Sequence, residues 1–592
     1  MADNYEYLQS AIPNSEPTAR TIKLDWSGLN MTNKLESGEL SDCNNVSSDE
    51  APYLSPCPIP SVKDVGVIFS ETVNGAIQNR YIQYPVAVHS LNNDVYVLWF
   101  RDVADEDGKL QAKYYFTRLG RGSVNSVTAG FVFEEGNNTR VTYEYLDVTN
   151  PGDAPGGENE QLKYLQDVHI KKGTTITSFI TYDENLNATQ SFIISPIPYG
   201  KCSIYTDNQR YSLVAKKRMF SIPSGFTGGN ASYIKPEVGE ICFPYITVNQ
   251  SRVFGATGAI AGASGYMNYG DWETDLSYQT KTQDGYGANH AWVSSLQSSD
   301  HSYSGEVTGI VAFGSRVVVF KADAMYEIAN TKNPFRVIDV FNTGCIDGRS
   351  AKVVGGNLFF ASEDGVYAYT GGKPECISRK LDIKRITSAV SGTDGKKYYL
   401  SCRYINKKDT DTSVLFVYDT ENGIWTKQDY KGDIIGMAYV DGHLYGIVNN
   451  STSIAPGNAD IVELNTENYE GQKWFAETDI LMNDTAGNYT IAPKRINKIA
   501  MLVEMNPGST LEISVIGADE DYEDGDVAKK SYVNESDEVK TVPIRLNIKK
   551  KADYGLRVRV SGEGFSKVYS MEITYTDGGT LNVTDREGVY KP

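Results

Sequence analysis

Short runs of alternating or continuous apolar residues recur along most of the chain. Between residues 62 and 465 they follow one another with turn signals between them, as in DVYVLWF (94–100), KKYYLSCRY (396–404) and IIGMAYVDGHLYGIV (434–448). Runs of about four to eight residues of this kind predict β-strands. Dipeptides typical of tight hairpins separate several of them: Asp364-Gly365, Asp394-Gly395, Asn422-Gly423 and Asp441-Gly442. The pattern predicts an all-β, antiparallel organisation.

Internal similarity favours a β-propeller over a sandwich or a barrel for this region. The run GNLFF (356–360) matches GHLYG (442–446), and VYAY (366–369) matches LFVY (415–418). Four-stranded units of about 40–50 residues are the repeat of propeller blades. We therefore expect a propeller over residues 61–468, with about six to eight blades. Stretches rich in Gly and polar residues predict insertions at 147–161 and 255–286.

The last part of the chain, residues 469–592, shows the clearest alternation. LEISVIG (511–517), IRLNI (544–548), LRVRVSG (556–562) and VYSMEITY (568–575) each place apolar residues at every second position. Such half-buried strands predict an antiparallel β-sandwich. The side chains expected on the buried faces are Leu511, Ile513, Val515, Ile544, Leu546, Ile548, Leu556, Val558, Val560, Tyr569, Met571, Ile573 and Tyr575.

The first 60 residues lack these patterns. The stretch 38–58 is rich in Asn, Ser, Glu and Pro, and Pro52, Pro56 and Pro58 exclude a regular helix or a central strand there. We interpret residues 1–60 as an extended N-terminal arm that is ordered only against something else. The edge of a first blade and a flexible tail are the alternatives. An arm of this kind predicts that removing residues 1–58 leaves the propeller and the sandwich folded.

The charge of the chain bears on its partners. Its 592 residues contain 75 Asp and Glu against 56 Lys and Arg, which gives a formal net charge of −19 at pH 7. Proteins that hold nucleic acid by its phosphates need clustered Lys and Arg. The basic runs here are short, as at 216–218 and 549–551. We therefore expect the chain neither to grip DNA nor to bind anionic membranes.

The cysteine pattern indicates synthesis in a reducing cytosol. The seven cysteines are odd in number and none are at C-x-x-C spacing, which argues against a zinc site and a disulfide framework. They are Cys43, Cys57, Cys202, Cys242, Cys345, Cys376 and Cys402. The first residues lack a basic region followed by an apolar one, so no secretory signal is expected. No run approaches about 20 apolar residues, so no membrane span is expected.

A search for catalytic and metal-binding motifs finds none in the sequence. No two of the histidines are at metal-ligand spacing, and neither a nucleophile elbow nor a phosphate-binding loop is present. The histidines are His89, His169, His290, His301 and His443. The acidic runs at 134–135 and 519–526 are interpreted as solvated turns, with a surface calcium ion at the second left open. We expect no enzymatic activity, no cofactor and no catalytic, cofactor-binding or metal residue; binding residues stay unassigned.

Three segments together resemble one family of proteins. In DCNNVSSDEAPYLSPCP (42–58) the matching residues are Asn45, Ser47, Ser48, Asp49, Pro52, Leu54, Ser55 and Pro56, with Cys57 where arginine is usual. In the central run 308–378 they are Gly344-Cys345, Arg349-Ser350, Asp364-Gly365-Val366-Tyr367 and Gly372. From Lys473 onward, KWFAETDILM and PKRINKIAMLVEMNPGSTLEISVIGAD also fit. The chain is thus similar to the tail nozzle or hub proteins of tailed bacteriophages, also described as packaged-DNA stabilization proteins.

This resemblance implies a structural protein of the virion tail, made in the cytoplasm of a host bacterium. Six copies would form a ring below the portal and adaptor proteins, extend the DNA channel, help to retain and deliver the genome, and meet distal fibre or needle proteins. Such a ring would carry about −114 formal charges, and repulsive walls let DNA pass without specific binding. No membrane insertion by this chain is implied.

Two other functions use the same scaffold. A receptor- or glycan-binding tail protein is the main alternative, because the aromatic residues Trp272, Tyr278, Tyr286 and Trp292 would stack on sugar rings. A propeller glycosidase is a third hypothesis, for which the sequence offers no catalytic pair. Images of particles and a glycan array separate these alternatives.

Overall fold

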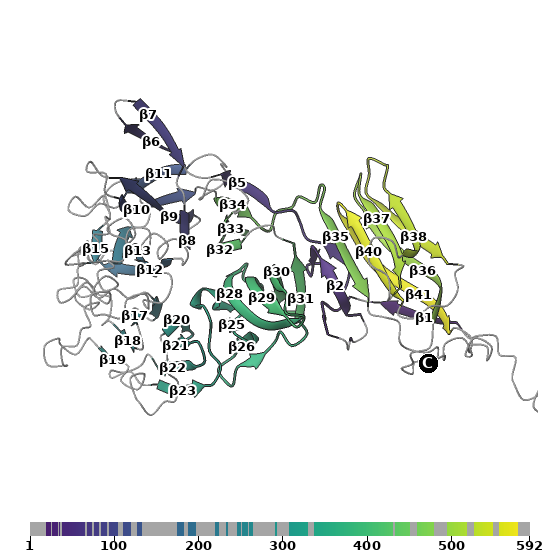
Figure 1. Cartoon of the computed structure of the whole chain (residues 1–592), viewed down its shortest axis with the longest axis horizontal. Helices are drawn as coiled ribbons and strands as arrows, with labels where there is room; N and C mark the ends of the chain where they lie inside the picture. The colour runs from purple at the N-terminus through teal and green to yellow at the C-terminus, as the bar shows by residue number, and fades with distance from the viewer. Residues whose placement is uncertain are drawn as a thin grey trace, which may run out of the picture. The chain divides into compact units, whose positions relative to one another are not determined.

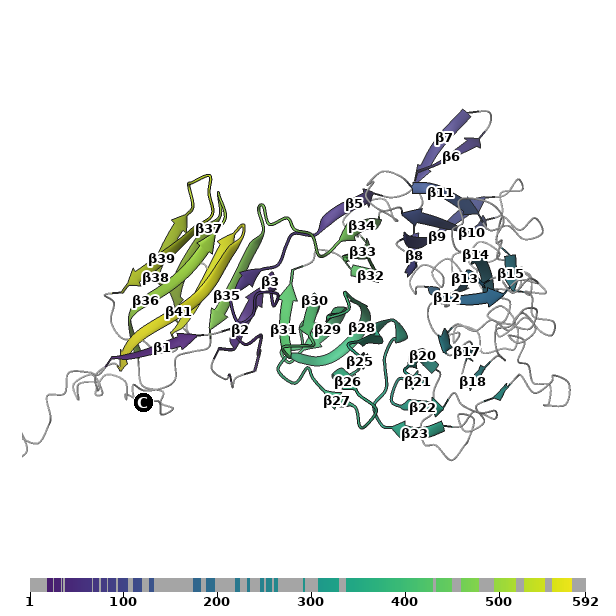
Figure 2. The ribbon, with the colours of Figure 1, turned by 180° about the vertical axis from the view of Figure 1, so that it is seen from behind.

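The chain forms two compact units, each rich in β-strands, in the computed structural model (Figure 1, Figure 2). The sandwich unit consists of Met1–Ile59, Asn422–Asp429 and Glu467–Pro592, and the propeller unit of Pro60–Glu421 and Tyr430–Thr466. The structure describes separate strands between 68 and 292 and, with short gaps, residues 19–65, 307–329, 337–449, 459–478, 494–517, 526–548 and 556–577.

Seven four-stranded antiparallel sheets follow one another among the described residues, and we number them as blades 1 to 7. Blades 1 to 3 are β8 (Tyr84–Leu91), β9 (Asp94–Ala104), β10 (Leu110–Leu119) and β11 (Val127–Val132); β12 (Thr174–Tyr182), β13 (Ala188–Pro196), β14 (Met219–Pro223) and β15 (Ser232–Ile234); and β16 (Tyr245–Asn249), β17 (Arg252–Thr257), β18 (Ile260–Ala263) and β19 (Ala291–Trp292). The predicted insertion at 147–161 and most of that at 255–286 lie outside the described residues.

The later blades are described in more detail. Blades 4 to 6 are β20 (Val307–Phe313), β21 (Arg316–Lys321), β22 (Met325–Ala329) and β23 (Val337–Phe341); β24 (Lys352–Val354), β25 (Asn357–Ser362), β26 (Gly365–Tyr369) and β27 (Glu375–Cys376); and β28 (Ile383–Thr393), β29 (Lys397–Asn406), β30 (Asp411–Asp419) and β31 (Ile424–Gln428). Blade 7 contains β32 (Asp433–Val440), β33 (His443–Asn449), β34 (Ala459–Glu463) and, from earlier in the chain, β5 (Ser61–Val65). A separate hairpin joins β6 (Ile68–Val73) to β7 (Ala76–Tyr81).

The blades close into a ring, which confirms the predicted propeller. β5 pairs antiparallel with β34, with Ser61 opposite Glu463, so the start of this unit supplies the outer strand of its last blade. The first strand of blade 7, β32, contacts the first strand of blade 1, β8. Figure 1 shows the first strands on the inner side of the ring. A closed ring of blades leaves only short, protected sheet edges.

Three of the four predicted hairpin dipeptides lie in turns between neighbouring strands, and the fourth, Asp364-Gly365, closes its turn, because Gly365 is the first residue of β26. At Asp441-Gly442, which joins β32 to β33, both residues have positive φ angles, 49° and 91°. Two-residue hairpins of this type need φ > 0 at both central positions, and Asp-Gly meets that need at low cost. The turn chemistry in the sequence therefore determined where these strands end.

Apolar clusters fill the space between consecutive blades. Blades 4 and 5 share a cluster that includes Val318, Phe320, Leu358 and Phe360, all 0% exposed. The rings of Phe320 and Phe360 lie 4.9 Å apart between centroids. A second cluster joins blades 6 and 7 through side chains such as Leu415, Met437 and Leu444. These interdigitating faces make each blade depend on its neighbours.

The sandwich unit contains two antiparallel sheets. One has the order β1-β41-β36-β39 and the other β2-β35-β40-β37-β38. Their bounds are β1 Arg20–Leu24, β41 Ser566–Asp577, β36 Lys494–Met505 and β39 Lys540–Asn547; then β2 Leu40–Asn44, β35 Lys473–Thr478, β40 Arg557–Glu563, β37 Thr510–Ile516 and β38 Asp526–Val533. A small hairpin of β3 (Val46–Ser47) and β4 (Ser55–Pro56) precedes the propeller.

The predicted alternation in the sandwich is confirmed except at one residue. The expected inward side chains from Leu511 to Val560, and also Met571, Ile573 and Tyr575, are at most 8% exposed. Tyr569 is only half-buried. The register of β41 against β36 shifts between Ser570 and Val568, and such a bulge moves the next side chain to the other face. Val568 takes the buried position instead, at 5% exposed.

The N-terminal segment is extended, as predicted, but its described part belongs to the sandwich unit. β1 pairs along β41 and β2 pairs along β35, so the segment supplies an edge strand to each sheet of the sandwich. Its apolar residues, sparse and without periodicity, are buried in that unit: Trp26, Leu29, Leu40, Cys43, Val46, Leu54 and Cys57. The edge strands β1 and β2 have five residues each, too few for alternation to show in the sequence.

Candidate functional site

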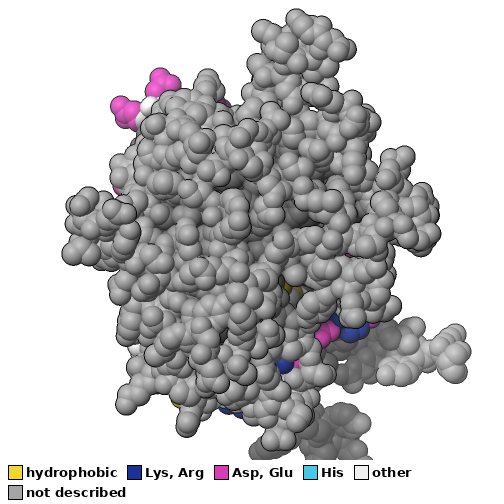
Figure 3. All heavy atoms as spheres, turned by 90° about the vertical axis from the view of Figure 1, so that its left-hand side faces the viewer, with side chains coloured by type: hydrophobic (Ala, Val, Ile, Leu, Met, Phe, Trp, Pro, Cys, Tyr) yellow, Lys and Arg dark blue, Asp and Glu magenta, His cyan; other side chains and the backbone are white. Residues whose placement is uncertain are grey.

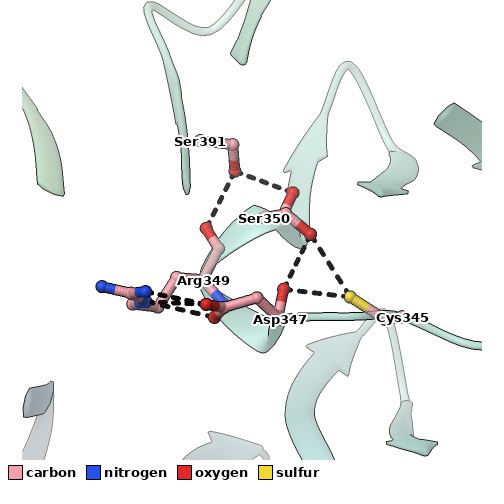
Figure 4. Close-up of polar contacts among 5 residues, drawn as sticks. All are labelled: Cys345, Asp347, Arg349, Ser350 and Ser391. Atoms are coloured by element: carbon pink, nitrogen blue, oxygen red, sulfur yellow. Dashed lines mark hydrogen bonds and ion pairs between the residues drawn. The ribbon is translucent and has the colours of Figure 1, made fainter. Parts of the chain in front are cut away.

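The turn that leads into blade 5 brings together several polar residues of the run 308–378, the central segment with a family resemblance (Figure 4). Its single helical turn, η4 (Gly348–Ser350), begins after Asp347, whose carboxylate accepts a hydrogen bond from the Arg349 backbone N–H at 3.0 Å. The same carboxylate receives the Arg349 guanidinium in a two-point contact, with Nη2 to Oδ2 at 2.7 Å and Nε to Oδ1 at 3.1 Å. A bidentate pair of this kind fixes both side chains.

Ser350 connects this turn to the rest of the blade. Its hydroxyl donates to the Asp347 carbonyl oxygen at 2.7 Å and accepts from the Ala361 N–H at 3.1 Å. Its own carbonyl oxygen accepts from the hydroxyls of Ser391 at 2.8 Å and Tyr398 at 2.7 Å, both in blade 6. Ser350 is 0% exposed. The Ser350 carbonyl oxygen therefore joins blade 5 to blade 6, while the Ser350 hydroxyl binds backbone groups of its own turn and of β25.

Cys345 lies beneath the same turn. Its thiol donates to the Asp347 carbonyl oxygen at 3.0 Å and lies 3.3 Å from the Ser350 hydroxyl. Complete burial raises the pKa of the Cys345 thiol to about 12. A protonated thiol is a poor nucleophile. The close Ser and Cys side chains thus serve packing and hydrogen bonding in this turn.

Two glycines allow the turn to approach blade 4. A Cβ placed on Gly348 would come within 2.5 Å of the Gly309 Cα, and the reverse placement gives the same distance. A Cβ on Gly344 would lie 2.3 Å from the Lys321 carbonyl oxygen. Backbone contacts this close admit only glycine. The requirement explains the glycines in this part of the run GCIDGRS (344–350).

Two cations lie at the inner end of blade 5. The Arg349 side chain is half-buried, at 23% exposed. This burial opposes the charge of its guanidinium, but the Asp347 carboxylate outweighs the effect and raises the pKa of Arg349. Lys352, at the start of β24, is half-buried, and burial lowers the pKa of its ammonium group. The sequence analysis missed both Asp347 and Lys352. The two-residue spacing of Asp347 and Arg349 could have indicated their ion pair. A single Lys at the start of a strand gives no such indication.

Residues 42–58, the first segment with a family resemblance, link strands β35 and β41 of the sandwich unit. Asn45 adopts a positive φ of 54° and its side chain donates to the Lys473 carbonyl oxygen at 2.8 Å. The Asp49 N–H donates to the Ser47 hydroxyl at 3.2 Å, and the Ser47 hydroxyl donates back to the Asp49 carboxylate. Leu54 bridges to Val568 of β41 through two backbone hydrogen bonds of 2.8 and 3.2 Å.

The residue that departs from the family pattern also has a structural role. Cys57 is 3% exposed, and its sulfur accepts a hydrogen bond from the Gln472 side chain at 3.3 Å. Close by, Lys567 forms an ion pair with Glu50, and the rings of Tyr53 and Tyr569 meet edge to face at 5.1 Å. The matching residues of this segment therefore act through turn geometry and main-chain contacts.

The other candidate residues are dispersed. His443 contacts the buried Glu463 carboxylate through Nδ1, and His89 lies in β8. His169, His290, His301 and the acidic runs at 134–135 and 519–525 lie outside the described residues. Of the four aromatic residues considered for sugar stacking, only Trp292 falls in a described strand, β19. Among the described residues, no group of three or more His, Cys, Asp or Glu side chains is arranged to hold a metal ion.

Two further observations concern the described residues alone. The five cysteines among them, Cys43, Cys57, Cys345, Cys376 and Cys402, are free thiols. No helix in the described part of the chain has the length and apolar character needed to cross a membrane.

Comparison with known proteins identifies no family. No family model matches the chain, and no curated protein matches it. Solved structures do match, among them the β-propeller domain of the Trilobed protease from Pyrococcus furiosus, with 10% identity and a TM-score of 0.32 over 64% of this chain and 93% of that one. A likeness at this level assigns no activity.

Two other matches correct an expectation of the sequence analysis. The Trypanosoma rangeli sialidase is 9% identical, with a TM-score of 0.27 over 89% of this chain and 96% of that one. A family 43 arabinoxylan arabinofuranohydrolase from Bacillus subtilis is 9% identical, with a TM-score of 0.23 over 84% of this chain and 96% of that one. The expectation that the chain is not an enzyme is wrong as an exclusion, because these two matched proteins are enzymes. The likeness transfers no reaction to this chain.

Proposed function

We propose that this chain is a structural protein of a tailed-phage virion and forms the nozzle or hub ring of the tail. In this proposal six copies surround the DNA path below the portal and adaptor proteins and meet the distal fibre or needle proteins. The chain is made in the host cytoplasm and ends in the virion tail. The resemblance in the N-terminal, central and C-terminal segments is the basis of the proposal.

One observation carries it: the resembling residues perform architectural tasks. Asn45, Ser47 and Asp49 set the turns of the segment 42–58, and the carbonyl oxygens of Arg349 and Ser350 accept hydrogen bonds from Ser391 of the neighbouring blade. Proteins that share such residues would share the contacts that make the fold rigid. Rigid, closed propellers suit the role of a spacer in a large assembly.

The charge of the chain supports passage of DNA without binding. The net charge is −19, and like charges keep phosphates from adhering to a channel wall. On the face that Figure 3 presents, the described charged side chains include both acidic and basic groups. Clustered cations of the kind that neutralise several phosphates would contradict this part of the proposal.

Electron microscopy of the purified full-length chain tests the proposal. A sixfold ring with an axial channel, of about 390 kDa from six chains of 65.3 kDa, is the expected result. Dispersed monomers that bind immobilised host glycans would instead support the alternative, a receptor- or glycan-binding tail protein on the same scaffold. Glycan binding by a chain that also forms the ring would add a second role to the hub.

A further inference from the structure

The end of blade 6 where β28 begins and β29 ends carries a cluster of cations. Residues 379–385 and 403–411 hold seven Lys and Arg against three Asp. All seven of these cations are exposed. We call this surface the basic patch. It reverses, locally, the sign of a chain whose net charge is −19.

Contacts between the two segments make the basic patch one continuous surface. β28 pairs along β29, and beyond this pairing the Lys384 ammonium group forms an ion pair with the Asp409 carboxylate. The Lys407 ammonium group donates a hydrogen bond to the Leu381 carbonyl oxygen at 3.3 Å. The cations before β28 and those after β29 therefore lie side by side.

The basic patch has the mixed charge of a protein-binding surface. Arg385 forms an ion pair with Glu363 at 2.9 Å and Arg403 with Asp411 at 2.6 Å, and all four side chains are more than half exposed. Exposed pairs of this kind contribute little to stability. Carboxylates among the cations repel phosphate groups, whereas a grip on DNA needs uncompensated cations. The arrangement therefore fits an acidic protein surface better than a nucleic acid.

The sandwich unit offers such a surface in the loop 534–539, between β38 and β39. Glu535, Asp537 and Glu538 are exposed there, and the loop contains no Lys or Arg. We call it the acidic loop. Val533 and Val539, at 46% and 55%, are the most exposed large hydrophobic residues in the described part of the chain. Apolar side chains gathered on a surface are typical of interaction sites.

The acidic loop is held in one conformation by Asn534, which is 2% exposed. The Asn534 side chain donates hydrogen bonds to the carbonyl oxygens of Met505 at 3.0 Å and Glu538 at 2.9 Å. Its Oδ1 accepts from the Ser536 hydroxyl at 2.7 Å. A loop fixed in this way presents its carboxylates at defined places, which lowers the entropy cost of binding.

We propose that the acidic loop of one copy docks on the basic patch of a neighbouring copy. The contact joins two different surfaces of the chain, so each copy in a pair keeps one free loop and one free patch. Contacts of this head-to-tail kind close into rings or extend into filaments. The inference rests on the ring in the proposed function and names the contact between its subunits.

Charge reversal in the full-length chain tests the contact, with self-association measured by sedimentation velocity. One variant combines Glu535→Lys and Glu538→Lys, and the other combines Arg379→Glu and Lys408→Glu. All four side chains are exposed, so both variants should fold. Each variant places like charges opposite one another and should weaken association by at least about tenfold. Joining all four substitutions restores opposite charges and should restore association.

A matched control changes two exposed carboxylates elsewhere in the sandwich unit. Glu467→Lys with Glu470→Lys alters the net charge as much as the loop variant does and should associate like the native chain. Native association in both reversed variants, or no recovery when they are joined, would overturn the contact and leave the ring itself standing. A native chain that stays monomeric would overturn both.

Duplex DNA provides the opposing outcome for the basic patch. The native chain is not expected to bind it. DNA binding by the native chain that is lost in the variant with Arg379→Glu and Lys408→Glu would show that the patch meets nucleic acid, and would overturn the proposal.

Discussion

Removal of residues 1–58 is expected to unfold the sandwich unit and leave the propeller unit folded. The truncation takes away β1 and β2, the edge strands that pair with β41 and β35. It keeps β5, which closes blade 7. The expected result is therefore a chain with one folded unit instead of two.

The magnitude follows from the side chains that the segment buries. Four large apolar residues are at most 7% exposed in the sandwich unit: Trp26, Leu29, Leu40 and Leu54. Burial of each contributes about 1.5–3 kcal/mol, so together they contribute about 6–12 kcal/mol. The total stability of a domain is about 5–15 kcal/mol. The loss is thus comparable to the whole free energy of unfolding.

Hydrogen exchange measured by mass spectrometry resolves the two units in one experiment. Peptides from β36 and β40 should lose protection in the truncated chain, while peptides from β25 and β29 keep theirs and act as the internal control. A graded version compares Leu40→Ala, expected to cost about 2–5 kcal/mol, with Val539→Ala, a residue 55% exposed and expected to cost under about 0.5 kcal/mol. Undiminished protection of β36 and β40 after truncation would refute the reasoning.

Three further predictions concern separate features. Gly348→Ala places a Cβ 2.5 Å from the Gly309 Cα and should lower the free energy of unfolding by about 1–3 kcal/mol or more in thermal denaturation. Gly372→Ala, with open space around the residue, is the control and should be nearly neutral. Equal effects of the two variants would contradict the close contact. Iodoacetamide at pH 8 should label Cys376, which is partly exposed, well before Cys345, whose pKa is raised to about 12 by burial. The reason is that the thiolate is the reactive form of cysteine. Early labelling of Cys345 in the folded chain would contradict its burial. A duplex-DNA anisotropy titration at low salt should show no micromolar affinity, and tight binding with a steep salt dependence would show that cations are gathered on one face.

The sequence predicted those parts of the fold in which a local pattern is strong. Alternation identified the inward side chains of β37, β39 and β40, and Asp441-Gly442 marked its hairpin, because burial of one face and positive φ angles leave direct traces in residue choice. The role of the first 60 residues was missed, because edge strands of five residues and a hairpin of two-residue strands are too short to show a period. Tyr569 was misplaced because a bulge in β41 depends on its partner strand.

The candidate site was less accessible to sequence reasoning. Arg349 and Ser350 were noticed through resemblance, but their partners come from other blades: Ser391 lies 41 residues from Ser350 and Tyr398 lies 48 residues away. Contacts across blades depend on the closure of the ring, which no local window contains.

Cryo-electron microscopy of purified virions that carry this chain tests the proposed function most directly. The expected result is a ring of six copies around the DNA path at the tail, in contact with the portal or adaptor proteins, with a propeller and a sandwich fitted to each copy. Absence of the chain from the particle would contradict the proposal. So would density for it only in peripheral appendages away from the DNA path.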